Sequence, residues 1–154
     1  MEERAYTVLL TEKQEIKLLE CDPQEDLFEL ARGAIGCDWI ELVEADALNQ
    51  KNCVMLIDEE GKLRDKPAGI NCVASDLYGS DQHGDPIVGS AIVVHTDEDR
   101  LELLTSGEAK ALTAELEAHR EQSITKISRA FGLRRPKERN PDRRQPCKTN
   151  GMER

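Results

Sequence analysis

The sequence predicts an α/β (α+β) fold, with a small mixed sheet of about five strands, about three helices and a disordered basic C-terminal tail. Two continuous apolar runs, at residues 53–57 and 87–94, are typical of central strands that are covered on both faces. Signals for helix starts lie at residues 22–25 and 105–108. After residue 133 the composition changes to proline and arginine without apolar periodicity, which predicts a chain that does not fold alone.

The N-terminal part predicts a hairpin and then a helix. Residues 6–10 and 15–19 are strand-like and flank the polar link 11–14. Asp22 is suited to cap a helix, with Pro23 at the first helical position and Glu25 completing a capping box. The apolar positions that follow at helical spacing are Leu27, Phe28, Leu30, Ala31, Ala34 and Ile35.

The middle of the chain predicts the rest of the sheet. Residues 39–43 form the third strand, with Glu41 facing outward and Trp39 more suited to a core anchor than to a binding platform. Residues 53–57 form a central strand, and the carboxylates at 58–60 form a solvated turn because they lack the spacing of a calcium loop. Residues 67–79 contain a short helix that ends at Gly79, a polar loop follows at 80–85, and residues 87–94 form the second central strand.

The last predicted helix begins with the capping box of Thr105 and Glu108. Its apolar stripe fades over residues 117–123 and resumes at Ile124. The pattern therefore leaves two alternatives, one long helix with a weak middle or two separate helices, and Gly132 is the natural end of either. We expect one domain over residues 1–133 and a tail over residues 134–154.

Charge divides the chain in the same way. Residues 1–119 hold 10 Lys and Arg against 27 Asp and Glu, a net charge of −17, whereas residues 120–154 hold 11 against 4, a net of +7. A strongly acidic body attracts basic partners over about one Debye length, roughly 8–10 Å at ordinary salt. The ordinary alternative is that the charge only keeps the protein soluble.

The five cysteines favour a reduced protein without a metal site. They are odd in number and form no C-x-x-C pair, and they stand at Cys21, Cys37, Cys53, Cys72 and Cys147. Buried free thiols in a reducing cytosol explain this pattern best. The chain also has no apolar run of the roughly 18 residues that a membrane span needs. We therefore expect a cytoplasmic protein with no membrane partner, no metal and no cofactor.

The densest polar chemistry lies at residues 78–85. Tyr78, Asp81, His83 and Asp85 could contact a ligand, because carboxylates beside an imidazole orient it and suit acid–base or metal chemistry. One loop cannot build a preorganised site alone, so an ordinary loop is the better interpretation and catalysis the weakest. As a lid over a signalling nucleotide this loop would make the chain a small-ligand sequestering protein, but no glycine-rich phosphate loop is present.

The basic tail offers a nucleic-acid interface. Its cationic residues could neutralise phosphates, giving weak and strongly salt-dependent binding. No aromatic residue follows Phe131, so base stacking is not expected. The candidates are Arg134, Arg135, Lys137, Arg139, Arg143 and Arg144.

Several ordered segments carry a family resemblance. Residues 36–41, 55–63 and 85–89, together with Asn71, Ala74 and Leu77–Tyr78, are similar to the domain-of-unknown-function family DUF3846 over about residues 5–116. The resemblance implies a compact α/β domain found in bacteria, their phages and conjugative elements, without an established activity or catalytic residue. Asn71, Asp85 and Gly89 match recurrent positions of that family, although turn formation or packing also explains each of them. Asn71 is one of the candidate ligand-binding residues.

These observations favour binding over catalysis. The chain contains no G-x-S-x-G, no H-E-x-x-H and no cysteine paired with histidine in a known motif. We expect a non-enzymatic accessory factor of a phage or mobile element that engages a host protein through its acidic surface, where the charge would suit mimicry of DNA. The alternatives are nucleic-acid binding through the tail and nucleotide sequestration. The sequence does not predict the oligomeric state.

Overall fold

The structure, a computed structural model, describes residues 5–61, 69–98 and 100–133. Six strands form one sheet in the order β2-β1-β5-β4-β3, with β6 pairing the far end of β5. Their bounds are β1 Ala5–Leu10, β2 Ile16–Cys21, β3 Ile40–Val43, β4 Cys53–Asp58, β5 Ala91–Asp97 and β6 Arg100–Glu102. The helices are α1 Leu27–Ile35, α2 Asp46–Asn49, α3 Cys72–Tyr78, α4 Ser80–His83 and α5 Ser106–Phe131. The α/β class with a small sheet is confirmed.

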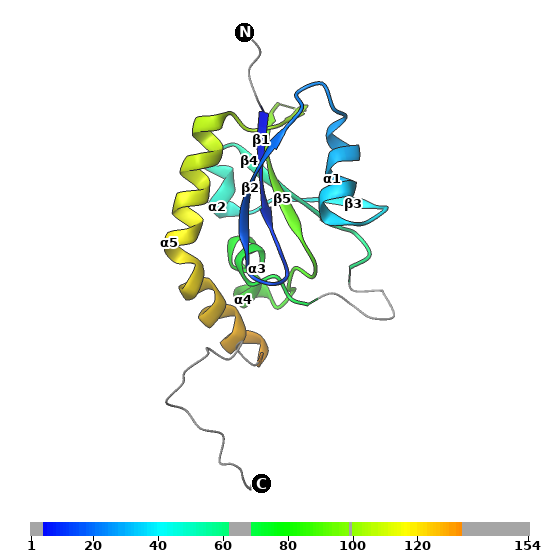
Figure 1. Ribbon diagram of the computed structural model, residues 1–154. Coiled ribbons are helices and arrows are strands. Elements are labelled where there is room, and N and C mark those ends of the chain that lie inside the picture. The colour runs from blue at the N-terminus through cyan, green and yellow to red at the C-terminus, as the bar shows by residue number, and fades with distance from the viewer. Residues whose placement is uncertain (1–4, 62–68, 99, 134–154) are drawn as a thin grey trace, which may run out of the picture.

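The sheet is antiparallel at each of its described pairings, rather than mixed as the sequence had suggested. Besides α1, α3 and α5, the helices include two single turns, α2 and α4, at segments expected to be connections. Figure 1 shows α5 along one side of the molecule and α1 on the other. The continuous apolar runs are explained by this layering. In β4, Val54 and Leu56 pack in the cluster that contains α1, whereas Met55 and Ile57 pack in the cluster that contains α5.

The second central strand begins later than its apolar run. Residues 87–90 do not join the sheet, because they bond to the segment around the start of α3 instead. The Asn71 N–H donates to the Ile87 carbonyl at 2.8 Å, the Gly89 N–H donates to the Gly69 carbonyl at 3.0 Å, and Gly89 has φ +88°. A residue in this left-handed region interrupts an extended strand, so β5 starts only at Ala91.

The first helix also begins later than predicted. Asp22 does not cap it, and its carboxylate accepts from the Gln24 N–H at 2.9 Å in a turn of its own. The cap is Asp26, whose carboxylate accepts from the N–H groups of Phe28 and Glu29. Asp22 and Asp26 could each cap a helix. Asp26 is the cap because a helix that begins there places its apolar stripe against the sheet.

One long helix, rather than two, closes the fold. The capping box of Thr105 and Glu108 is present, and Gly132 caps the far end with φ +65°. The two halves pack on different clusters, Leu112 and Leu116 on the sheet and Ile127 against α3. The weak middle is where the helix passes from one cluster to the other, and its good helix formers keep it continuous. Among the described residues, no helix is long and apolar enough to cross a membrane.

Candidate functional site

Asn71, a predicted ligand residue, lies entirely inside the protein. Its side chain is 0% exposed, and its amide donates to the carbonyls of Leu10 and Gly89 at 2.9 Å each. Its Oδ1 accepts from the Ala74 N–H at 3.1 Å and so caps α3. Because both amide hydrogens and the carbonyl oxygen are used within the fold, this residue ties β1, α3 and the segment before β5 together.

The residues of the predicted ligand loop brace one another. The rings of Tyr78 and His83 meet edge to face, with centroids 4.6 Å apart. Nδ1 of His83 accepts from the Asp85 N–H at 3.2 Å, which leaves the ring proton on Nε2, 3.2 Å from the Tyr78 carbonyl. Both ring nitrogens are therefore engaged in holding the turn that contains α4. Asp81, on α4, is half-buried.

Two of these residues also meet β3 and β4. Tyr78 and Asp85 line a small cavity of about 100 Å³ together with Glu41, Asp58 and Glu59. Ligand sites of drug size are usually about 300–1,000 Å³, so a nucleotide does not fit this cavity as it stands. Within the described parts of the chain, no group of three or more His, Cys, Asp or Glu side chains is arranged to hold a metal ion.

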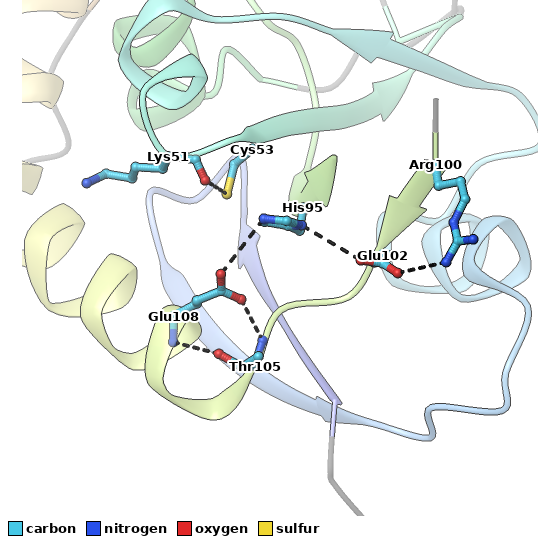
Figure 2. A network of polar contacts seen from close by, with 7 residues as sticks. All are labelled: Lys51, Cys53, His95, Arg100, Glu102, Thr105 and Glu108. Atoms are coloured by element: carbon cyan, nitrogen blue, oxygen red, sulfur yellow. Dashed lines mark hydrogen bonds and ion pairs between the residues drawn. The ribbon is translucent and has the colours of Figure 1, made fainter. Parts of the chain in front are cut away.

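A second polar cluster joins residues of β4, β5 and β6 to the start of α5, and no sequence pattern indicated it. Figure 2 shows His95 between two carboxylates, Glu102 of β6 and Glu108 of α5. Each lies 3.9 Å from a ring nitrogen, so the contacts are ion pairs when the imidazole is protonated and too long for hydrogen bonds. Cys53 lies directly across from His95 in the sheet. The strand register places Cys53 and Glu102 beside His95, and the packing of α5 adds Glu108, although these residues are spread over 56 positions of sequence between 53 and 108.

Beside this cluster lies a cavity of about 240 Å³. Leu104, Ala111 and Leu112 form its apolar wall, and Cys53 lines it. The Cys53 thiol donates to the Lys51 carbonyl at 3.5 Å, and burial, followed by the charge of Glu108, raises its pKa. A raised pKa favours the thiol over the thiolate, which is the form that acts as a nucleophile.

The third feature is a stretch of the chain that we call the acidic segment, residues 20–60. It holds 12 Asp and Glu against 2 Lys and Arg. Eleven of those carboxylates are exposed and the twelfth, Asp58, is half-buried. Both bases are already paired, Arg32 with Glu29 and Lys51 with Glu115. Within residues 20–60 the carboxylates therefore outnumber the bases by ten.

The acidic segment also exposes large apolar side chains. Three of the four exposed large apolar residues of the described chain lie in it: Phe28 at 45%, Trp39 at 60% and Leu42 at 45% exposure. The expectation that Trp39 anchors the core is wrong. It immediately precedes β3, the edge strand, where no described strand covers it. The three residues lie on α1, on the connection to β3 and on β3, which are neighbouring elements.

The candidate nucleic-acid residues, from Arg134 to Arg144, lie outside the described residues, so that prediction stays a prediction.

Residues 6–117 match the model of the family described as a domain of unknown function, DUF3846. Because the match spans more than half of the chain, the chain belongs to this family, and the resemblance is confirmed. No curated protein and no solved structure matches the chain.

Proposed function

We propose that this DUF3846 chain is a non-enzymatic binding protein that engages a basic partner protein through the acidic segment. The observation that carries the proposal is the coincidence of charge and apolar exposure there. The acidic segment contains twelve carboxylates and two bases, and it also exposes Phe28, Trp39 and Leu42. Interfaces combine aromatic anchors with a charged rim, in which the anchors supply affinity and the rim steers association.

The side chains most suited to catalysis, Cys53 and His83, give weaker support for binding over catalysis. The Cys53 thiol faces a histidine across the strands but is held protonated by its surroundings. His83, the other histidine near carboxylates, has both ring nitrogens bound within its own turn. We therefore place the function on the surface of the acidic segment. The setting, an accessory factor of a phage or mobile element acting on a host protein, is inferred from the family resemblance alone.

The test is capture from a nuclease-treated bacterial lysate at low salt, with the full chain and two charge-matched triple variants. One variant carries Asp38→Asn, Glu41→Gln and Glu44→Gln, three exposed carboxylates of the acidic segment. The control carries Glu98→Gln, Glu117→Gln and Glu121→Gln, three exposed carboxylates elsewhere. Both change the net charge equally, so only the position of the charge differs.

We expect the first variant to bind a captured partner about tenfold more weakly than the unchanged chain, since each rim charge contributes a fraction of a kcal/mol. The control variant should bind within about twofold. Trp39 is the only tryptophan of the chain, so its fluorescence reports directly on this surface. Equal binding by all three proteins would contradict the proposal.

The basic tail supports a second candidate, nucleic-acid binding, on its charge alone. Its test is to compare DNA and RNA binding by the full chain and by a chain that ends at Leu133. Loss of a steeply salt-dependent affinity on truncation would support it. Unchanged affinity would exclude the tail as the binding element.

A further inference from the structure

The open edge of the sheet at β3 carries an arrangement that narrows the kind of partner. β3 is the last strand in the sheet order and pairs only with β4 among the described residues. The Glu59 N–H donates to the Trp39 carbonyl at 3.0 Å, so Trp39 and Glu59 form a hydrogen-bonded pair that continues the register of β3 and β4. This pair sets which backbone groups of β3 face β4 and which face outward.

In an antiparallel pair, hydrogen-bonded positions alternate with positions that are not hydrogen-bonded. Counting from Trp39, Glu41 and Val43 direct their N–H and C=O groups to β4. Ile40 and Leu42 therefore direct theirs away from β4, to the open edge. Two residues apart, they offer the donors and acceptors that a further strand would use.

Natural edge strands are usually protected by charge, proline or cover. This one is short and carries Glu41, but it also exposes Leu42 and, just before the strand, Trp39. An edge built only to avoid pairing would not expose two large apolar side chains at that place. Open backbone groups together with apolar anchors are what strand addition requires.

The charge around the edge selects the added strand. Residues 33–50 contain no Lys or Arg, and their carboxylates, Asp38, Glu41, Glu44 and Asp46, are all exposed. Glu59, bonded to Trp39 through its N–H, is exposed as well. An acidic or neutral strand would meet repulsion or gain nothing here, whereas a basic one gains cross-strand pairs with opposite charges.

We propose that a basic, extended segment of a partner protein adds to the sheet at β3. It would pair its backbone with Ile40 and Leu42, place its cationic side chains on the face of Glu41, and place apolar side chains on the other face, against Leu42. This inference rests on the proposed function and specifies how the acidic segment binds.

The test uses a short capped peptide of alternating lysine and valine as the probe, with backbone amide exchange of the full chain as the readout. In the free protein the Ile40 and Leu42 amides should exchange quickly, while those of Glu41 and Val43 are slowed by β4. On addition of the peptide we expect the exchange of Ile40 and Leu42 to slow at least about tenfold and that of Glu41 and Val43 to change little. The same peptide with N-methyl groups on consecutive residues, which blocks both of its edges, should not produce this pattern.

Two variants separate backbone pairing from side-chain contact. Leu42→Thr keeps the outward N–H and removes much of the apolar side chain, whereas Leu42→Pro also removes that N–H without removing a bond to β4. We expect Leu42→Pro to bind the peptide about five- to tenfold more weakly than Leu42→Thr, as the loss of one net hydrogen bond predicts. If Leu42→Pro does not fold, the N-methylated peptide measures the contribution of backbone pairing to binding on the unchanged chain instead.

The outcomes that overturn the inference are distinct. Peptide binding without alternating protection, lost in the Asp38, Glu41 and Glu44 variant, would mean that the acidic segment binds by charge without strand addition. Binding that survives in that variant would remove the proposed function as well. Protection of Ile40 and Leu42 in the free chain would overturn the partner segment as occupant. If that protection depends on protein concentration, a second copy of the chain occupies the β3 edge. If it vanishes in a chain ending at Leu133, the chain's own tail occupies it.

Discussion

Two regions of the molecule, α5 and the acidic segment, treat their charges in opposite ways. The helix α5 and its end, residues 106–133, hold four acids and four bases. Several of these are paired, as Lys126 is with Asp76 of α3 at 2.9 Å and Arg120 with Glu117 at 3.7 Å. The acidic segment holds twelve acids against two bases and exposes Phe28, Trp39 and Leu42.

This difference in charge balance indicates which of the two regions serves as the scaffold. α5 buries one face, balances its charge and reaches across to tie the β1–β2 turn, where the Arg120 guanidinium donates to the Gln14 carbonyl at 3.1 Å. Such a surface is explained by stability alone. The acidic segment accepts self-repulsion and exposed apolar area that stability does not explain, a cost that proteins commonly carry at functional surfaces.

The largest expected effect falls on the scaffold side of this comparison. Asn71→Ala should lower the free energy of unfolding by about 3–4 kcal/mol, because it leaves two buried carbonyls without a donor and removes the cap of α3. Urea unfolding measures the change. Asn71→Asp keeps the capping oxygen but sets a buried carboxylate against the Leu10 and Gly89 carbonyls, so it should destabilise the fold at least as much. A loss under about 1 kcal/mol for Asn71→Ala would return this residue to the list of binding candidates.

A pair of leucine substitutions compares the two faces directly. Leu112→Ala on α5, where the side chain is 5% exposed, should cost about 2–4 kcal/mol in unfolding free energy. Leu42→Ala on β3, at 45% exposure, should cost less than about 1 kcal/mol because much of its surface already meets water. In binding the order should reverse. A large stability loss for Leu42→Ala would mean that this residue is structural.

Stability should also fall in alkali through the buried thiols. Burial raises the pKa of Cys53 and of Cys21 above the ordinary 9.0. A thiol whose pKa is higher in the folded than in the unfolded state stabilises the fold below the unfolded pKa, and this contribution is lost as the pH rises through the folded value. Unfolding free energies at pH 8 to 11 should therefore decline less steeply for Cys53→Ala than for the unchanged chain. An equal decline of unfolding free energy with pH in both proteins would contradict the raised pKa of Cys53.

The smallest expected effect is on stability, when carboxylates of the acidic segment and of α5 are neutralised separately. The variant with Asp38→Asn, Glu41→Gln and Glu44→Gln should be as stable as the unchanged chain or more stable by a few tenths of a kcal/mol at low salt, as repulsion is relieved. Glu117→Gln should be neutral or slightly destabilising, since it loses an exposed pair with Arg120. Thermal unfolding at low and high salt distinguishes the two. A destabilised triple variant would show that these carboxylates serve the fold.

Much of the fold was predictable because it depends on local signals. The hairpin, the two central apolar runs, the end of α3 at Gly79 and the capping box at Thr105 were all visible as short patterns. The direction of strand pairing was not, since continuous apolar runs indicate cover on both faces and say nothing of whether neighbours run parallel. The start of α1 was misplaced because Asp22 and Asp26 carry the same local signal, and only packing on the sheet decides between them.

The candidate site was harder to predict than the fold. The loop at residues 78–85 is dense in polar groups, yet its histidine is engaged within its own turn. The cluster around His95 depends on strand register, which no single segment encodes. Trp39 was expected in the core because large aromatics usually are buried, and its exposure follows only from its place beside an edge strand. The acidic charge itself was visible, but the exposure of nearly all of its carboxylates was not.

The most direct test of the central claim is hydrogen exchange of the full chain with and without a captured partner protein, followed by mass spectrometry. We predict that protection gained on binding concentrates in peptides covering residues 25–44 and 58–60, with α5 unchanged. Protection concentrated on α5 or on residues 78–85, with none near β3, would contradict it.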